Sequence, residues 1–126
     1  MLTRAHVEQV VRAALDEDAP WGDLTSETLI PADATATAEL RAREAGVFSG
    51  GDVFASAFRL TDLRLEVTLL RAEGEAFAPG DVLALVSGPA RGLLTAERVG
   101  LNFAQRMSGI ATLTAAHVAA VAHTPA

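Results

Sequence analysis

The chain contains neither cysteine nor lysine among its 126 residues. Without cysteine it can form no disulfide, no thiolate metal site and no cysteine nucleophile, a composition that fits a reducing compartment. Without lysine it can have no P-loop lysine, no Schiff-base lysine and no lysine that carries a biotinyl or lipoyl group. These two absences exclude several large classes of enzyme and carrier protein.

Positive charge and long apolar runs are also scarce. Ten Arg face sixteen Asp and Glu, so the formal net charge is −6, the wrong sign for a general binder of the nucleic-acid backbone. Residues 1–11 carry Arg4, His6 and Glu8, unlike the core of a signal peptide, and residues 109–122 are too short and too rich in Thr and Ala to span a bilayer. We therefore expect a cytoplasmic protein that binds neither nucleic acid nor membrane.

The size of the chain limits its interior. A protein of 13.1 kDa folds with about 6,400 Å² of accessible surface, enough for one modest hydrophobic core and not for two. Half of the residues are apolar and the mean hydropathy is +0.28, which excludes a disordered tail and is high for a small soluble monomer. We expect part of the apolar surface to meet a partner.

Hydrophobic periodicity predicts a helix followed by a strand-rich region. Apolar residues at helical spacing indicate a helix over residues 3–15, with Thr3 as its N-cap. Alternating apolar and polar residues predict strands over 34–43 and 63–69, with a short helix over 53–58 between them. Two tight turns, Glu73–Glu75 and Pro79–Asp81, lead into further short strands, the second of them over 82–86.

The composition becomes helical from about residue 92. The pattern predicts two helices, over 93–107 and 110–123. The shift marks a boundary near residue 91, which divides an N-terminal α+β domain, residues 1–91, from a helical segment, residues 92–126.

Two neighbouring stripes follow the helical segment. The first consists mostly of small residues that would let another backbone approach closely: Leu93, Ala96, Gly100, Ala104, Met107 and Ala111. The second contains Leu94, Arg98, Leu101, Gln105 and Ser108. Because the two stripes together cover much of the helix, we expect it to pack on more than one side.

Arg98 is the most informative polar residue, because it lies in line with Leu94 and Leu101 on a face that we expect to be covered. Its planar guanidinium suits a carboxylate or a phosphate, which it can bind through two parallel hydrogen bonds. Two interpretations stay open: a structural Arg that pairs with an acidic residue or reaches water, or an Arg presented to an anionic ligand. Arg91 lies on nearly the same face and Arg106 is rotated away by about 80°; for both, a surface role is favoured.

The histidines and the acidic residues near the N-terminus do not by themselves predict a metal or catalytic site. His117 and His123 are six residues apart on a helix and point to opposite sides, so we predict no metal site in this chain. The acidic run Asp16–Asp18 lies at the negative end of a helix dipole, and is either a solvated charge run or part of a loop that shapes a site. Asp18 and Asp23 are a candidate carboxylate pair, although acids near a glycine more often make turns and caps.

Four ordered parts of the chain carry a family resemblance. Residues 14–18 (ALDED) with 22–26 (GDLTS), residues 43–51 (REAGVFSGG), residues 94–103 (LTAERVGLNF) and residues 107–112 (MSGIAT) span almost the whole chain in order. They resemble the words A-L-x-E-D-x-x-x-G-D-x-T, A-R-E-x-G-V-x-S-G, L-L-x-x-E-R-x-x-L-N and L-S-G-I-A-T of the quinolinate phosphoribosyltransferase family. The sequence is identified on these words as a member of that family, in its N-terminal part.

The resemblance implies an enzyme that makes a pyridine nucleotide. Quinolinate and phosphoribosyl pyrophosphate, with Mg²⁺, would give nicotinate mononucleotide, pyrophosphate and CO2 in NAD biosynthesis. It implies an α+β fold: an N-terminal domain of hammerhead-like α/β sandwich form, followed by helices that lead into an incomplete α/β barrel. It also implies that Arg98 contacts the carboxylates of quinolinate, in the active site of the neighbouring subunit of a homodimer.

The chain is less than half as long as members of that family, and the barrel is missing. The family's other substrate contacts and its Mg²⁺ ligands lie beyond residue 126, so no catalytic residue and no metal ligand is assigned to this chain. We therefore expect the 126-residue polypeptide by itself to be inactive. Two other hypotheses stay open: a related phosphoribosyltransferase-like paralogue associated with molybdenum, and a non-catalytic dimerisation module.

Overall fold

The computed structural model of the protein describes residues 3–18 and 30–122. Within these residues, the helices are α1 (Arg4–Asp18), α3 (Gly51–Thr61) and α4 (Ala90–Ala122). The strands are β1 (Thr35–Arg41), β2 (Gly46–Val47), β3 (Glu66–Leu69), β4 (Ala76–Phe77) and β5 (Val82–Pro89). The protein is therefore a mixed α/β domain, as the sequence predicts.

The strands form two antiparallel sheets. In the larger sheet β5 lies between β1 and β3, and the smaller sheet pairs β2 with β4. Val86 of β5 lies opposite Ala38 of β1 on one side and Val67 of β3 on the other, and all three contribute to the same apolar cluster. The alternation in β1 places its Ala and Leu side chains inward and its Thr, Glu and Arg side chains in water, as predicted.

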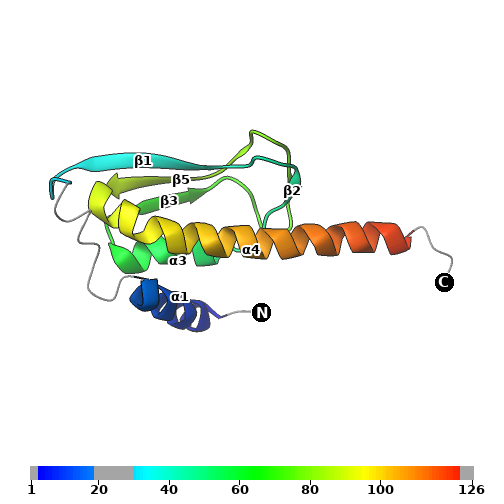
Figure 1. The fold of residues 1–126 in the computed structure, drawn as a ribbon, viewed down its shortest axis with the longest axis horizontal. Helices are drawn as coiled ribbons and strands as arrows, with labels where there is room; N and C mark the ends of the chain where they lie inside the picture. The colour runs from blue at the N-terminus through cyan, green and yellow to red at the C-terminus, as the bar shows by residue number, and fades with distance from the viewer. Residues whose placement is uncertain (1–2, 19–29, 123–126) are drawn as a thin grey trace.

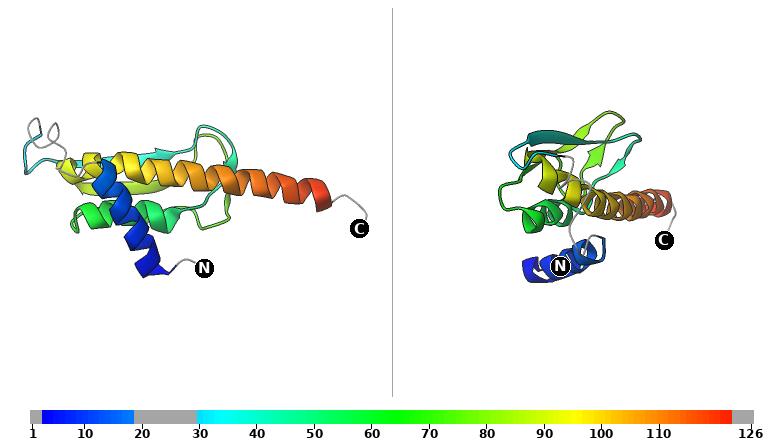
Figure 2. Two further views of the ribbon diagram at one scale, coloured as in Figure 1. Left: turned by 60° about the horizontal axis from the view of Figure 1, so that its bottom comes forward. Right: turned by 60° about the vertical axis from the view of Figure 1, so that its left-hand side comes forward.

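The elements form three layers (Figure 1). The larger sheet covers one side of α3 and α4, and α1 covers the other side, as the turned views also show (Figure 2). Apolar residues fill both spaces: Phe54, Leu93 and Ala96 lie under the sheet, whereas Val11 and Val99 lie beneath α1. The interior is thus divided between the two faces of a helical layer, instead of forming the single core expected from the size of the chain.

The small-residue stripe of α4 packs against α3. Leu93, Ala96 and Ala104 are buried, and an added Cβ at Gly100 would lie only 3.0 Å from Phe58 Cε2 and 3.3 Å from Phe54 Cδ2. The two phenylalanine rings pack edge to face, with centroids 5.0 Å apart. The stripe thus packs closely against α3, as expected of small residues, and at Gly100 two aromatic side chains of α3 fill the space.

The prediction of two C-terminal helices is wrong, because α4 is continuous from Ala90 to Ala122. Gly109 sits where a break was predicted, but its φ is not positive and a Cβ there would meet nothing within 4 Å. One exposed glycine costs a helix about 1 kcal/mol, which is too little to end a helix that packs along most of its length. His123, the predicted last residue, lies outside the described residues.

The strand predicted over residues 63–69 begins three residues later. Leu63, predicted to face inward, is 89% exposed, whereas Leu65 is buried. The Asp62 carboxylate accepts a hydrogen bond of 2.9 Å from the Arg64 N–H, and the Asp62 carbonyl accepts one of 3.1 Å from the Leu65 N–H. The first residues of the alternating pattern therefore belong to this turn, and β3 starts after them.

The N-terminal helix forms as predicted. Thr3 Oγ1 accepts a hydrogen bond of 3.2 Å from the His6 N–H, which is the N-cap geometry expected before α1. Asp16 and Glu17 are exposed in the last turn of α1. Among the described residues, no helix is both long enough and apolar enough to cross a membrane.

A matched pair of substitutions on α4 tests the close approach to α3. Gly100→Leu should lower the free energy of unfolding by about 1–3 kcal/mol, because the new side chain would overlap the two phenylalanine rings. Gly109→Leu should raise it by up to about 1 kcal/mol, because the site is open and leucine favours a helix. Both are measured by urea unfolding; equal effects would contradict the packing described.

Candidate functional site

Arg98 and Asn102 form a polar row on the side of α4 that faces away from α3. Leu94, Arg98 and Asn102 follow one another at intervals of four residues and are all exposed, Leu94 by 42%. The sequence led us to expect Leu94 and Arg98 on a covered face; within this chain that face is open to solvent. Helical spacing places these residues on one face, but it does not determine whether another molecule covers that face.

The two arginines that flank Arg98 take different roles. Arg91 is half-buried, and its Nε donates a hydrogen bond of 2.6 Å to the Ile30 carbonyl oxygen, so it joins α4 to the segment before β1. Arg106 is exposed on another side of α4, as its rotation from Arg98 predicts. Arg91 therefore ties the fold together and does not extend a basic patch.

Two hydroxyl groups of α4 hold strand β2. The Val47 N–H donates to Thr112 Oγ1 at 2.9 Å, and the Ser49 N–H donates to Ser108 Oγ at 3.0 Å. Ser108 Oγ in turn donates to the Ser49 carbonyl oxygen at 3.0 Å. At Gly46, an added Cβ would come within 2.9 Å of Thr112 Oγ1, so the strand lies directly against the helix.

This contact brings together two of the sequence segments that carry the family resemblance, residues 43–51 and 107–112. Gly50 has a φ of +88°, and an added Cβ would lie 2.8 Å from Met107 Sδ, so the position favours glycine on two grounds. Gly46, Gly50, Ser108 and Thr112 are thus explained by the packing of the two segments against each other.

A groove of about 750 Å³ lies beside this contact, between α4 and the end of β1. Its apolar lining includes Phe48, Phe77 and Leu101. Its charged lining is balanced: Glu39, Arg41, Arg43 and Glu44. Arg41 is itself held by Glu39 Oε2 at 2.6 Å and by the Gly80 carbonyl oxygen at 3.2 Å. The groove therefore offers no concentration of positive charge for an anion.

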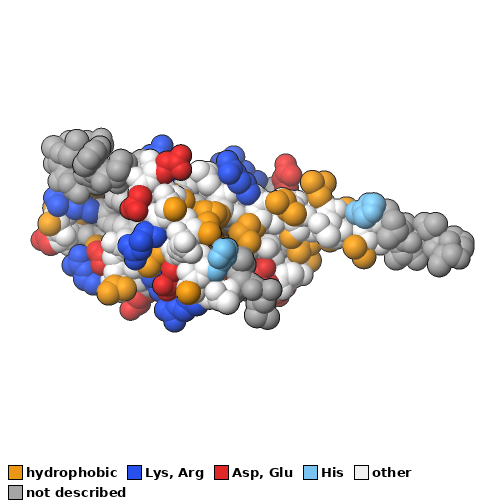
Figure 3. Space-filling model, turned by 90° about the horizontal axis from the view of Figure 1, so that it is seen from below, with side chains coloured by type: hydrophobic (Ala, Val, Ile, Leu, Met, Phe, Trp, Pro, Cys, Tyr) orange, Lys and Arg blue, Asp and Glu red, His pale blue; other side chains and the backbone are white. Residues whose placement is uncertain are grey.

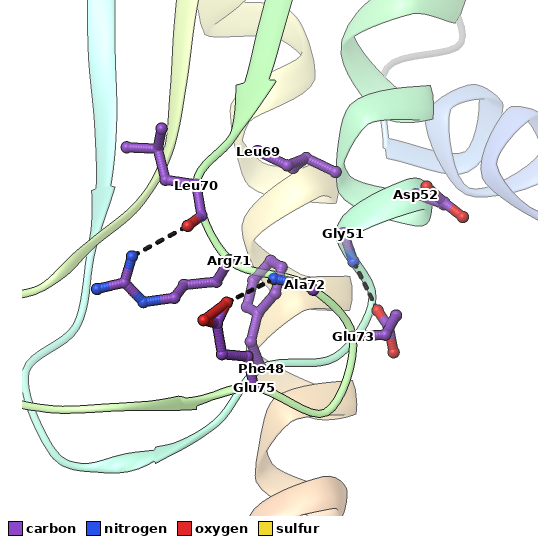
Figure 4. A pocket seen from close by; sticks show the side chains of 9 residues that line it. All are labelled: Phe48, Gly51, Asp52, Leu69, Leu70, Arg71, Ala72, Glu73 and Glu75. Atoms are coloured by element: carbon purple, nitrogen blue, oxygen red, sulfur yellow. Dashed lines mark hydrogen bonds between the residues drawn. The ribbon is translucent and has the colours of Figure 1, made fainter.

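A second hollow, of about 510 Å³, lies near the N-terminus of α3 (Figure 4). Glu73 occupies the position that an anionic ligand would take there. Its Oε1 accepts hydrogen bonds from the N–H groups of Gly50 at 2.5 Å and Gly51 at 3.1 Å, and its Oε2 accepts one of 3.0 Å from Ser49 Oγ. Glu73 is thus the cap of α3, a role that the sequence analysis missed because it read the residue only as part of a turn.

The side chains whose pKa values are shifted lie in turns. The hydrogen bond from the Arg64 side chain lowers the pKa of Asp62, and the same contact raises the pKa of Arg64. The Ala78 N–H, and then Arg71, lower the pKa of Asp81 in the turn before β5. None of these groups lies on the polar row of α4, so they mark turn geometry and no reaction centre.

The described residues contain no group of three or more His, Asp or Glu side chains that could hold a metal ion. His6 and His117 are both exposed, on α1 and on the far part of α4. Asp23, one member of the candidate carboxylate pair, lies outside the described residues.

Comparison with known proteins places this geometry in a family. The family described as "Quinolinate phosphoribosyl transferase, N-terminal domain" matches residues 23–108. A probable carboxylating nicotinate-nucleotide pyrophosphorylase of Bacillus subtilis is 40% identical over 98 residues, which are 78% of this chain and 34% of the relative. The carboxylating nicotinate-nucleotide pyrophosphorylase of Mycobacterium leprae is 42% identical over 122 residues, 92% of this chain and 42% of the relative.

Solved structures agree with the sequence relatives. A nicotinate-nucleotide pyrophosphorylase from Francisella tularensis superposes with a TM-score of 0.91 at 29% identity, over 98% of this chain and 44% of that one. NadC from Streptococcus pyogenes superposes with a TM-score of 0.92 at 36% identity, over 98% of this chain and 44% of that one. The chain thus spans about a third to less than half of the length of the proteins it matches.

The hydroxyl contact of α4 with β2 can be tested on two threonines of the same helix. Thr112→Val should lower the free energy of unfolding by about 1–2 kcal/mol, because the Val47 N–H loses its acceptor in a half-buried place. Thr114→Val makes the same chemical change at an exposed position and should act within about 0.5 kcal/mol. Urea unfolding measures both, and a harmless Thr112→Val would show that the contact contributes nothing.

Proposed function

Because the chain belongs to the quinolinate phosphoribosyltransferase family, whose N-terminal domain it matches, we propose that it is the N-terminal part of an enzyme that transfers phosphoribose to quinolinate. The donor is phosphoribosyl pyrophosphate, and the products are nicotinate mononucleotide, pyrophosphate and CO2. This reaction supplies NAD biosynthesis, and we place it in the cytoplasm.

The observation that carries the proposal is the position of Arg98. It lies within the matched region, in the segment that resembles the family's E-R-x-x-L-N word, and its side chain is exposed on a well-packed helix. The buried neighbours Ala96, Val99 and Gly100 fix the rotation of α4 at this point. The packed helix fixes the backbone from which Arg98 extends, and its planar guanidinium can bind a carboxylate through two parallel hydrogen bonds.

Quinolinate is a dicarboxylate, so its recognition needs cations. Arg98 supplies one charge and two parallel N–H donors to a carboxylate, which orients the pyridine ring for attack by its nitrogen on the phosphoribosyl carbon. Positive charge near the ring also stabilises the loss of a carboxylate as CO2. The Mg²⁺ of the reaction, when bound, would neutralise the pyrophosphate, and its ligands belong to another part of the enzyme.

The open face around Arg98 supports a site shared between subunits. Leu94, one turn before Arg98, is 42% exposed, so this face offers some apolar surface beside the guanidinium for another subunit to cover. We propose that the protein forms a homodimer in which Arg98 of one subunit enters the active site of the other. The substrate site is then completed only by assembly.

Replacement of Arg98 in the quinolinate-dependent enzyme tests its role as a substrate contact. Arg98→Ala should raise the KM for quinolinate by about 10- to 150-fold without unfolding the protein, because a charge-assisted contact contributes roughly 1.5–3 kcal/mol. Arg98→Lys should also impair binding, because the planar fork is lost. Arg106→Ala, an exposed arginine on the same helix, should leave the KM unchanged; equal effects at 98 and 106 would refute the assignment.

The 126-residue chain alone should not release pyrophosphate from phosphoribosyl pyrophosphate in the presence of quinolinate and Mg²⁺. Its ten arginines are dispersed over the fold, so they cannot neutralise a dicarboxylate and a pyrophosphate together. A pyrophosphate-release assay measures this directly, paired with the intact mass of the native protein. Turnover by the isolated chain would contradict the proposal that the rest of the site lies elsewhere.

A further inference from the structure

Glu73 reaches the start of α3 from the turn between β3 and β4. The backbone ties this turn to the segment before α3, because the Gly74 N–H donates a hydrogen bond of 2.9 Å to the Phe48 carbonyl oxygen. The Glu73 carboxylate accepts hydrogen bonds from the Ser49 hydroxyl and from the N–H groups of the two glycines that follow it, the second of which is drawn in Figure 4. Glu73 thus holds three consecutive residues.

Helix α4 holds the first two of these residues as well. Ser108 Oγ accepts a hydrogen bond from the Ser49 N–H and donates one to the Ser49 carbonyl oxygen, both at 3.0 Å. The Met107 side chain packs against Gly50, where an added Cβ would lie 2.8 Å from Sδ and 3.2 Å from Cβ of Met107. Ser49 and Gly50 therefore link the Glu73 carboxylate to α4, although Glu73 and Ser108 are not hydrogen-bonded to each other.

This link meets α4 where the helix leaves the rest of the fold. Among the described residues, the hydrogen bonds that join α4 beyond Met107 to other elements come from Ser108, which holds Ser49, and from Thr112, which holds β2. Residues 113–118 are exposed, and this part of the helix extends past the sheet (Figure 1). The direction of the protruding part therefore depends on how firmly β2 and the segment after it are held.

We infer that Glu73 is a positioning residue, which acts through Ser49 to fix the direction of the protruding part of α4. A cap of α3 needs only the bonds from the glycine N–H groups. The bond from the Ser49 hydroxyl, at 3.0 Å, extends the hold of Glu73 to the residue that α4 itself binds. Three donors on one carboxylate make the contact charge-assisted, and so stronger than one with a neutral acceptor.

The consequence for the enzyme rests on the proposed function, because it takes the exposed side of α4 to meet a neighbouring subunit. A change in the direction of α4 would then displace the residues that complete the shared site. Displacements of about 1 Å, even far from the reacting atoms, can slow an enzyme strongly. Glu73 would thus affect the reaction without contact with a substrate.

Amide hydrogen exchange on the 126-residue protein separates a positioning residue from a cap of α3. Glu73→Ala should speed exchange at Gly50 and Gly51 about 10- to 150-fold, because both N–H groups lose a charged acceptor. It should also speed exchange of the Val47 N–H, which is bonded to Thr112 of α4, by about 2- to 30-fold. The amides of β5 report global unfolding and are the internal reference. A role in capping alone predicts no change at Val47.

Glu75 supplies the matched control, because it lies in the same turn and its Oε1 accepts the Ala72 N–H within that turn, at 3.0 Å. Glu75→Ala should leave the exchange of Val47 unchanged. Glu73→Gln keeps an acceptor oxygen in place, so it should restore most of the protection that Glu73→Ala removes.

The link can also be tested from its other end, which covers the case that Glu73→Ala does not fold. Because coupling between two sites is reciprocal, Ser108→Ala should speed exchange of the Gly51 N–H, which is bonded to Glu73 and not to Ser108. An unchanged Gly51 signal would show that the two ends are independent and would overturn the inference.

The quinolinate-dependent enzyme provides the functional measurement. At a temperature where all variants are folded, Glu73→Ala should lower kcat/KM by about 2- to 30-fold, Glu73→Gln should recover most of it, and Glu75→Ala should leave it unchanged. Unchanged exchange at Val47, or faster exchange with normal kcat/KM, would overturn the positioning role and leave the proposed function, which Arg98→Ala tests separately. If Val47 responds but Arg98→Ala leaves the KM for quinolinate unchanged, the proposed function fails and the link from Glu73 to α4 stands.

Discussion

The contact between α4 and α3 determines how the rest of the molecule is arranged. Gly100 removes the side chain that would separate the two helices, so α4 lies against the edge-to-face pair Phe54 and Phe58. The same helices receive the sheet on one side and α1 on the other. With three sides of α4 taken by these contacts, Arg98 and Asn102 are left on the fourth, exposed side. The close packing that stabilises the fold thus also determines which residues the helix presents.

The described segments that carry the family resemblance differ in what their side chains contact. Residues 43–51 and 107–112 meet in space, and hydrogen bonds and close packing between them account for Gly46, Gly50, Ser108 and Thr112. Residues 94–103 differ, because Arg98 and Asn102 are exposed on the side of α4 that faces away from α3. Among the described segments, residues 94–103 are therefore where we look for a ligand contact, whereas residues 43–51 and 107–112 join the strands to α4. The C-terminal part of α4 protrudes from the rest of the fold (Figure 3). It carries no Arg, Asp or Glu side chain, and its exposed Ile110 and Leu113 favour burial against another protein surface.

Much of the fold could be predicted from the sequence, because its signals are local. The alternation in β1, the cap at Thr3 and the small-residue stripe of α4 each depend on residues a few positions apart. The errors arose where distant contacts outweighed a local signal. Packing along α4 carries the helix through Gly109, and the Asp62 turn delays β3 beyond Leu63.

The site was only partly predictable for a related reason. Helical spacing places Arg98 on one face of α4 but does not determine whether that face is covered. Glu73 was missed because its partners at Gly50 and Gly51 are more than twenty residues away in the chain. The division at residue 91 and the entry of Arg98 into a neighbouring subunit stay predictions.

The most direct test of the central claim is a crystal structure of the protein with bound quinolinate, in its native assembly. The account predicts that the Arg98 guanidinium of one subunit lies about 3 Å from carboxylate oxygens of quinolinate held mainly by another subunit. Quinolinate bound at a distance from α4, with Arg98 directed into solvent, would contradict it.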